Sequence, residues 1–590
     1  MALDSKQPNT VPSTARGYDA NNNLIVPGLP EFTRIYLVNR HGFKADIGEM
    51  VLSIDIVEDL YSPILKGTLR IHDKINFFEE YQFDGSESVR MLIEVQASQT
   101  VINYLDLSFK FVNFSRFEKT AESINVQQYD VELVNYITYA SQLSKICRRI
   151  KDDPYEQIKL IFKELTKDQG DSTISWKPYV NGNEELQTLS NPHLNVTRLQ
   201  GNITSRSPLS AIEFLRTKCF DLSFSPFFIY NQLSPDSARG GGSSGDGKGL
   251  RKSRENILIS SLSDLVEDAT NPVYQPEVTT ARDAEGLPKA YRYTAGFTSD
   301  KSILPGTEEY LDSQILKILS LNSNLNLSYL NTAAQGGFGN QTNIVDYLRK
   351  DLLNKQFNPG FDGADSWILK EFRPSEENAN DKLIAFADIK YNGIPISVGG
   401  PAGASDGAAN NTELFKQSQT TLHLPSSQEP NPEDSGIAVP ARTDTRTHND
   451  PPENVDFRTA PEIYANGLNQ MNYYYGQLAG RQELQISLHG DLSLNPGKRI
   501  FLEIPRSDPQ EGDAVAAKSP EEELDMILSG IYLIITAAHK FETGNYVTIV
   551  KCIKLKHHPL RTPKGKAYTA KATKNLKKNG WRDKRALYAP

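Results

Sequence analysis

One stretch of the chain comes close to a phosphate-binding loop. Residues 242–248 read GSSGDGK, which fits the first seven positions of the motif whose backbone amides and lysine hold phosphates. The next position must be a serine or threonine to bind the metal ion, but Gly249 occupies it. A true phosphate loop also leads directly from a strand into a helix, and the basic residues 251–254 start a helix poorly. The sequence therefore predicts a flexible loop here and no nucleotide site.

The histidines form no recognisable metal site. None of the nine is paired with another at helical spacing, and the adjacent His557 and His558 would diverge along a strand instead of binding one ion. His539 is expected just past a strand, as a packed or edge histidine. We therefore expect no metal ion and no cofactor.

The three cysteines, Cys147, Cys219 and Cys552, are too few and too scattered for a disulfide framework or a thiolate metal site. We expect buried free thiols. The cations beside Cys147 could lower its pKa, but no motif partner is near it in the sequence. A helix end that carries solvated arginines is the simpler interpretation of that segment.

Acidic pairs could in principle serve a hydrolase. A glycosidase needs two carboxylates that face each other across a cleft, and the candidates are Glu58-Asp59, Glu79-Glu80 and the run at 521–523. Each is interpreted as a solvated face. No serine lies in a nucleophile elbow, so the sequence predicts a protein without enzymatic activity.

The end of the chain is strongly basic although the net charge is −9. Residues 551–585 contain one acid, Asp583, among many lysines and arginines. This segment could bind phosphates, could be a solvated tail, or could be an arm ordered on an acidic neighbour. Aromatic residues for base stacking are sparse, and Trp581 suits a docking anchor. We favour a partner-binding arm, with the candidate residues Lys571, Lys574, Lys577, Lys578, Trp581, Arg582, Lys584 and Arg585.

Three strands in succession are predicted between residues 48 and 95. Leu52, Ile54 and Ile56 alternate with polar residues, which is the period of a strand with one buried face. A second alternating run follows Gly67, a turn is expected at Asp73-Lys74, and a third run covers 89–95. Such a meander can close into a small barrel.

A similar order of strands recurs near the other end of the chain. Residues 484–492 lead through the turn 495–497 into 499–505, and 532–542 precede 546–550. The pattern matches 54–60 with 486–492, and 110–118 with 532–542. It favours an internal duplication, although any two meanders share some of this likeness.

These residues also carry a family resemblance. The series Glu58-Asp59-Leu60, Pro63, Gly67, Ile71, Asp73, Gly85 and Glu87 resembles the first barrel of tail-hub proteins from T-even-like contractile-tailed phages. The segment 529–541, together with Gly490 and Gly497, is similar to their second barrel. The resemblance covers most of 31–140 and 478–556. It implies a homotrimeric ring in which six barrels join a three-fold spike to a six-fold tail tube. In this family any lysozyme activity resides in the associated spike protein.

The predicted fold is β-rich α+β, with two similar antiparallel tube-like β-barrels, an inserted α/β domain and long loop insertions. At 590 residues the chain should hold several domains. Helices are expected from Pro154, from Ser207-Pro208, at 342–353 and at 461–478, and a hairpin is expected at 315–330. The domains are expected at 1–30 (extended arm), 31–140 (first barrel), 141–305 (α/β, with a flexible loop at 236–254), 306–350 with 478–556 (second barrel), 351–477 (insertion, irregular at 399–456) and 557–590 (basic arm).

The predicted function is a structural hub in the tail baseplate of a virion, made in the host cytoplasm. Its expected partners are itself, the spike protein, the tail tube or its initiator, and the tape-measure protein, with DNA only in transit. No run approaches the roughly 20 apolar residues of a membrane helix, and no signal peptide is evident. The alternatives are a β-rich tail-associated hydrolase or carbohydrate-active protein, a hub of a non-phage contractile injection system, and a tail component that binds DNA through 551–590.

Overall fold

The computed structural model describes a β-rich α+β protein, which confirms the predicted fold class. None of its described helices is long and apolar enough to cross a membrane. The N-terminal residues 1–29 and the basic residues 559–590 lie outside the described part. The described residues are 30–83, 85–96, 101–119, 127–150, 154–166, 174–178, 201–217, 225–234, 236–239, 254–266, 271–276, 289–293, 315–324, 340–346, 351–357, 418–424, 471–472, 474–476, 478, 482–505, 524–525, 528–542 and 545–558.

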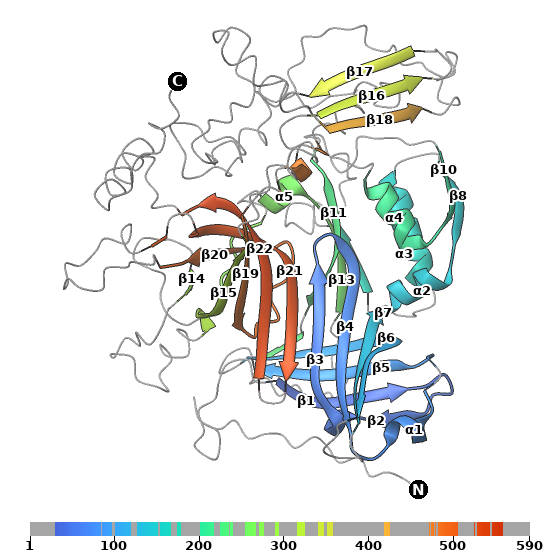
Figure 1. Ribbon diagram of the computed structural model, residues 1–590, viewed down its shortest axis with the longest axis vertical. Helices are drawn as coiled ribbons and strands as arrows, with labels where there is room; N and C mark the ends of the chain where they lie inside the picture. The colour runs from blue at the N-terminus through green and yellow to red at the C-terminus, as the bar shows by residue number, and fades with distance from the viewer. Residues whose placement is uncertain are drawn as a thin grey trace, which may run out of the picture.

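One half of a large, almost entirely antiparallel sheet comes from the N-terminal part of the chain (Figure 1). Seven strands pair in the order β3-β4-β7-β6-β5-β1-β2 and are here named the first unit. Their alternating apolar residues form one core around Ile54, Leu69 and Val131. The strands are β1 (Pro30–Val38), β2 (Lys44–Asp46), β3 (Val51–Asp59), β4 (Ser62–Asp73), β5 (Ser88–Gln96), β6 (Val101–Lys119) and β7 (Gln127–Asn135).

The other half of the sheet comes from segments far along the chain. Six strands pair in the order β15-β19-β22-β21-β20-β14 and are here named the second unit. They enclose a separate core around Leu484, Ile534 and Val550. The strands are β14 (Tyr291–Arg292), β15 (Ile318–Asn324), β19 (Glu483–His489), β20 (Arg499–Glu503), β21 (Gly530–Glu542) and β22 (Asn545–His557).

The two units share one order of pairing. The series β3-β4-β7-β6-β5 in the first unit matches β15-β19-β22-β21-β20 in the second, and every pair in both is antiparallel. Bulges recur at equivalent places, between Val51 and Ser53 on β3 and between Ile318 and Ser320 on β15. The bulged residues, Leu52 and Leu319, are exposed in both units. This arrangement supports an internal duplication.

The pairing also corrects the alignment made from sequence. The likeness of 486–492 to 54–60 equates β19 with β3, but in the sheet β19 takes the place of β4, and β15 takes the place of β3. Alternation of apolar and polar residues is common to all half-buried strands, so it does not reveal which strand is which. Leu52 was expected on the buried face with Ile54, but the bulge turns it outward. In the second unit a parallel bridge between Arg292 of β14 and Lys317 brings the two ends of the series together at the start of β15. Among the described strands no pairing closes the first unit, so a closed first barrel stays a prediction.

A mixed α/β layer joins the two units in sequence. The helices expected from Pro154 and Ser207 are confirmed, and they pack on β11 through a core that includes Ile212, Phe227 and Ile229. Ser207 caps its helix by accepting a hydrogen bond from the Ser210 N–H at 3.4 Å. The elements are α2 (Tyr136–Leu143), β8 (Ile146–Ile150), α3 (Pro154–Thr166), β9 (Ile174–Pro178), β10 (Gly201–Arg206), α4 (Pro208–Arg216), β11 (Phe227–Ser234), β13 (Arg254–Ser261) and α5 (Leu262–Val266).

Several local predictions are wrong. The helix expected at 342–353 is replaced by strands β16 (Asn340–Asp346) and β17 (Asp351–Phe357), in a sheet with β18 (Ser418–Leu424). The β-branched residues at 342, 344 and 345 favour a strand over a helix. Strand β18 lies inside the segment expected to be irregular, and β12 (Asp236–Arg239) lies inside the expected flexible loop. Strand β15 runs straight through 322–324, where the hairpin turn was expected. The described residues between 471 and 478 are helical as expected.

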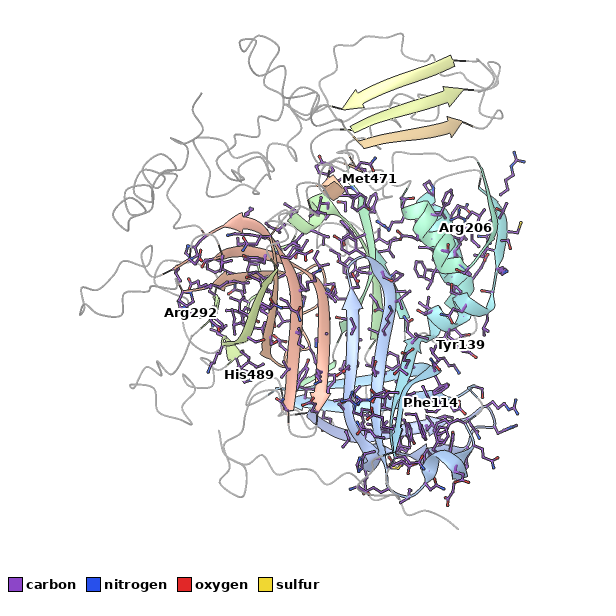
Figure 2. All side chains as sticks on the ribbon, in the orientation of Figure 1. Phe114, Tyr139, Arg206, Arg292, Met471 and His489 are labelled. Carbon is purple, nitrogen blue, oxygen red and sulfur yellow. The ribbon has the colours of Figure 1, made fainter. Side chains whose placement is uncertain are left out.

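An aromatic cluster fills one end of the first unit, around Phe114 in Figure 2. It surrounds the short helix α1 (Phe77–Tyr81), which comes directly after strand β4 in the chain. A 3-10 turn, η1 (Gly48–Met50), precedes β3. Phe78 alone packs against Phe83, Phe114, Phe117 and Tyr129.

The turn into α1 depends on Asp73. This side chain is fully buried and accepts three backbone N–H groups, from Ile75 at 3.1 Å and from Phe77 and Phe78 at 2.9 Å each. A buried carboxylate with three donors is well satisfied. The expected turn at Asp73-Lys74 is thus present, and its carboxylate positions the aromatic cluster.

We predict that Asp73→Ala destabilises the first unit by about 1–2 kcal/mol, because it removes the acceptor of three partly buried or exposed N–H groups at the start of α1. The midpoint of urea unfolding should fall accordingly. Asp46→Ala is the matched control, since Asp46 is exposed and accepts only the comparable Gly48 N–H at 3.0 Å. Equal midpoints for the two variants would contradict this role of Asp73.

Candidate functional site

The two units are joined edge to edge by strands β3 and β21. They pair antiparallel over seven residue pairs, from Thr536 opposite Asp59 to Glu542 opposite Ser53. Just beyond this ladder, the Leu60 N–H donates to the Ile535 carbonyl oxygen at 2.8 Å. On the same edge of β21, the preceding residues pair with β20. We name this junction the seam.

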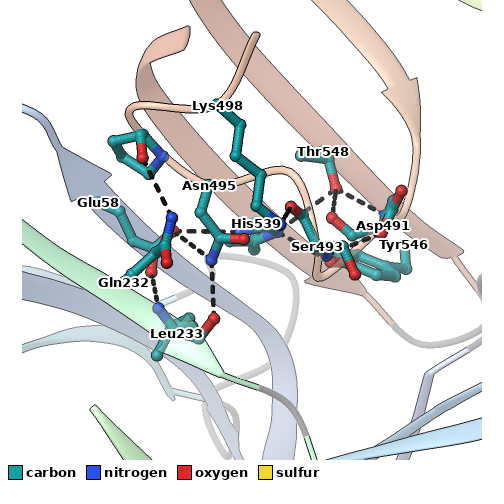
Figure 3. A network of polar contacts seen from close by, with 11 residues as sticks. Glu58, Gln232, Leu233, Asp491, Ser493, Asn495, Lys498, His539, Tyr546 and Thr548 are labelled. Carbon is teal, nitrogen blue, oxygen red and sulfur yellow. Dashed lines mark hydrogen bonds and ion pairs between the residues drawn. The ribbon is translucent and has the colours of Figure 1, made fainter. Parts of the chain in front are cut away.

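A buried carboxylate lies at the seam. Glu58 is fully buried on β3, at a point where the register with β4 shifts. It accepts a hydrogen bond from the Leu233 N–H of β11 and another from the Asn495 side-chain amide at 3.3 Å (Figure 3). His539 of β21 places Nε2 3.7 Å from the carboxylate. One side chain of the first unit therefore contacts the α/β layer and the second unit together.

The amide of Asn495 extends this junction. It donates to the Leu233 carbonyl oxygen at 2.8 Å as well as to Glu58, so that it pairs with both the backbone and the carboxylate. The neighbouring Gln232 donates to the Pro496 carbonyl oxygen at 3.3 Å. These bonds fasten the loop between β19 and β20 to the last residues of β11.

On its other side, His539 contacts buried hydroxyl groups of the second unit. Its Nδ1 lies 2.8 Å from the Tyr546 hydroxyl and 3.4 Å from that of Thr548. Burial raises the pKa of Tyr546 well above its ordinary value, so that this phenol keeps its proton. The imidazole is thus held between the Glu58 carboxylate and a hydroxyl pair.

The loop between β19 and β20 carries charges of both signs. Asp491 accepts hydrogen bonds from the Ser493 N–H and the Tyr274 hydroxyl, each at 2.8 Å. Lys498 donates to the Ser493 carbonyl oxygen at 2.6 Å. Burial lowers the pKa of Lys498, and the negative charges of Asp491 and Glu58 partly oppose that shift.

Two glycines let this loop approach its neighbours. A Cβ atom at Gly490 would lie 1.9 Å from Cδ1 of Tyr546, so no side chain fits there. Gly497 has a φ of +84° and would place a Cβ atom 2.7 Å from the Tyr230 hydroxyl. Both glycines belong to the motif that resembles the hub family, and the structure gives each a physical reason.

The site is a closed junction. Its titratable groups bond to one another and to backbone, which suits a rigid connection between parts of the chain. A separate cavity of about 350 Å³ lies near the start of β4, lined by α2 and α4. Its lining holds one carboxylate, that of Glu213, which is paired with Arg216. This cavity does not offer the facing carboxylate pair of a glycosidase.

Several residues singled out from the sequence lie elsewhere than expected. Glu58 was interpreted as part of a solvated face but is fully buried, because it continues the alternation of Ile54 and Ile56 on the inward face of β3. His539 is packed as expected, although it lies within β21 instead of past a strand. Cys552 is a buried thiol as expected. Cys147 is exposed on strand β8, not at a helix end.

The other candidates from the sequence are His558, a metal site and the basic arm. His558 is buried, stacked on Phe501, with its Nε2 3.4 Å from a Glu503 oxygen. Within the described residues no cluster of side chains could hold a metal ion. The basic arm residues Lys571 to Arg585 lie outside the described residues. Sequence reasoning missed Asn495, whose only signal was its place in an Asn-Pro-Gly turn.

Comparisons with known proteins give only distant likenesses. The sequence matches no family model and no curated protein. Among solved structures, a tail protein from Neisseria meningitidis has 8% identity and a TM-score of 0.39, with 88% of this chain and 96% of that chain covered. A 43 kDa tail protein of a Shewanella oneidensis prophage has 6% identity and a TM-score of 0.37, with coverage of 88% and 98%. A type VI secretion component from E. coli has 7% identity and a TM-score of 0.31, with coverage of 85% and 73%. At TM-scores this low, the likenesses do not establish a shared fold.

We predict that Glu58→Ala lowers the stability of the seam by about 3 kcal/mol, because it leaves the buried Leu233 N–H and one N–H of the Asn495 amide unpaired. Thermal unfolding should begin at a lower temperature than in the wild type. The control is Glu49→Ala, which removes an exposed carboxylate of the same first unit. If both variants melt like the wild type, Glu58 does not hold the units together.

We further predict that Gly490→Ala is strongly destabilising, because the methyl group would overlap the buried Tyr546 ring. Limited proteolysis should cut the second unit faster in this variant. Gly48→Ala serves as the control, since its Cβ atom would come no closer than 3.3 Å to a neighbour, an oxygen of the exposed Asp46 side chain. Equal cleavage rates for the two variants would show that the loop tolerates a side chain at position 490.

Proposed function

We propose that the protein is the central hub of a contractile-tail baseplate, a ring of three chains that joins a three-fold spike to a six-fold tail tube. The observation that supports it is the seam between two units of the same strand order. Three chains with two units each would present six similar units. A three-fold partner can then bind one face of the ring and a six-fold partner the other.

The contact at the seam is of the kind that builds rings. It joins the β21 edge of one unit to the β3 edge of the other, so the two contacting edges are different. Such a heterologous contact, when repeated, forms a ring if the rotation closes and a filament if it does not. The stoichiometry of three comes from the resemblance of residues 31–140 and 478–556 to the hub family.

The hub role assigns the remaining parts of the chain. The ring would leave a central channel through which DNA passes without being gripped, consistent with the net charge of −9. The basic arm with Trp581 would bind a neighbouring tail component such as the tape-measure protein. The protein would have no enzymatic activity and no cofactor, and it would reside in the virion tail after synthesis in the host cytoplasm. The same geometry would serve the hub of a non-phage contractile injection system.

Light scattering of the purified chain tests the proposal. A trimer has three times the chain mass of 65.9 kDa, about 198 kDa, and this mass should persist on dilution into the micromolar range. If the chain is monomeric, the measurement is repeated with the spike protein added, since the spike can supply the three-fold template. A monomer in both measurements would contradict the hub function.

A further inference from the structure

The internal repeat shows which strand edges correspond to the seam. In the second unit, β21 pairs with β20 up to Leu533 and then, from Thr536 onward, with β3. In the first unit, β6 pairs with β5 up to Lys110, the position equivalent to Leu533. The half of β6 beyond that point, residues 112–119, has no strand on this edge among the described residues.

The partner strand at the seam has an equivalent as well. Strand β3, which pairs with β21, corresponds to β15 by its order in the sheet and by its bulge. Strand β15 pairs with β19 along one edge, and on its other edge a bridge to Arg292 of β14 is formed only at the preceding residue, Lys317, which leaves 318–324 without a strand partner there among the described residues. Within each chain, the edge of β21 pairs with the edge of β3. The equivalent edges of β6 and β15 do not pair with each other and have no strand partner among the described residues.

Exposure of side chains agrees with this assignment. Ile535 of β21 is 5% exposed at the seam, whereas Val112, its equivalent on β6, is 41% exposed. His539 is fully buried, whereas Phe117, which occupies its place opposite β7, is 45% exposed. Residues that the seam covers in one unit are thus uncovered, and apolar, in the other. An open strand edge is a site for pairing with another chain, and this one carries two exposed apolar side chains beside the exposed ion pair of Arg116 and Glu118.

We propose that the 112–119 edge of β6 in one copy pairs antiparallel with β15 of a second copy, in the register of the seam. This inference rests on the proposed ring. At the seam, His539, Lys540 and Phe541 lie opposite Ile56, Asp55 and Ile54. The equivalent pairs between copies are Phe117 with Ser323, Glu118 with Asn322, and Lys119 with Leu321.

The contact between copies differs from the seam in its chemistry. Phe117 replaces His539, so this position cannot pair with a buried carboxylate. Backbone hydrogen bonds and the burial of Val112 and Phe117 hold the copies together. Every unit then contacts its neighbours through the same two edges, which is the condition for a closed ring of alternating units.

Paired cysteines test the register. Glu118→Cys combined with Asn322→Cys, in a Cys147→Ser background that removes an exposed thiol, places two thiols directly opposite each other across copies. Oxidation should give covalent dimers and trimers on a non-reducing gel. The control, Glu118→Cys with Ser320→Cys, is displaced by two residues and should link much less. Each single cysteine should give no link, because the proposed contact joins different edges.

A charge placed on the edge gives an independent readout. Val112→Lys should weaken association about tenfold or more, with an unchanged circular dichroism spectrum, because Val112 is already exposed in the single chain. Phe43→Lys, at another exposed apolar residue, should leave the trimer intact.

The outcomes separate this inference from the proposed function. Suppose that the wild type is a trimer. If the variant with cysteines at 118 and 322 then forms no link, or the displaced control links equally well, the assigned edges are wrong and the hub function still stands. A link in a single-cysteine variant also overturns the assigned edges, because it shows that the same edge of two copies is in contact. A chain that stays monomeric with and without the spike overturns both.

Discussion

The structure depends on one constraint: the open edge of β3 must be paired, and the pairing strand, β21, belongs to the other unit. Unpaired strand edges invite association with other chains, and the chain satisfies this one internally. Glu58 makes the choice specific, because a buried carboxylate must have all its partners in place. Those partners come from β11, from the loop around Asn495 and from His539. An arrangement of the units without these contacts would remove two of the partners of Glu58, Asn495 and His539.

The same constraint explains why the α/β layer and the loop between β19 and β20 have the form they have. Strand β11 supplies both the N–H and the carbonyl oxygen of Leu233, so the α/β layer forms part of the junction. Gly490 and Gly497 let the loop lie close to Tyr546 and Tyr230. A rigid junction fixes one orientation between the units, and a fixed orientation is what a repeated contact needs in order to close into a ring.

Features with a local physical cause could be predicted from the sequence. The strands around Ile54, Leu69 and Met91 follow from alternation, and the helix after Ser207-Pro208 follows from its cap. Features set by distant partners could not. The inward position of Glu58 follows from its alternation with Ile54 and Ile56, but the amides that pair with its carboxylate lie more than 170 positions away in the chain. The strand at 340–346 is the central strand of a sheet, and one of its two partners, 418–424, is distant in the chain. The sequence indicated an internal duplication, but the correct correspondence between the strands of the two units required the order of strand pairing in the sheet.

The central claim is that one edge contact, used once inside the chain and again between chains, builds a ring of six similar units. Single-particle electron microscopy of the purified full-length protein tests it most directly. The account predicts ring-shaped particles with six lobes around a central opening, in which alternate lobes differ because they come from different units. Open filaments, or particles in which the two units of a chain meet no second copy, would contradict it.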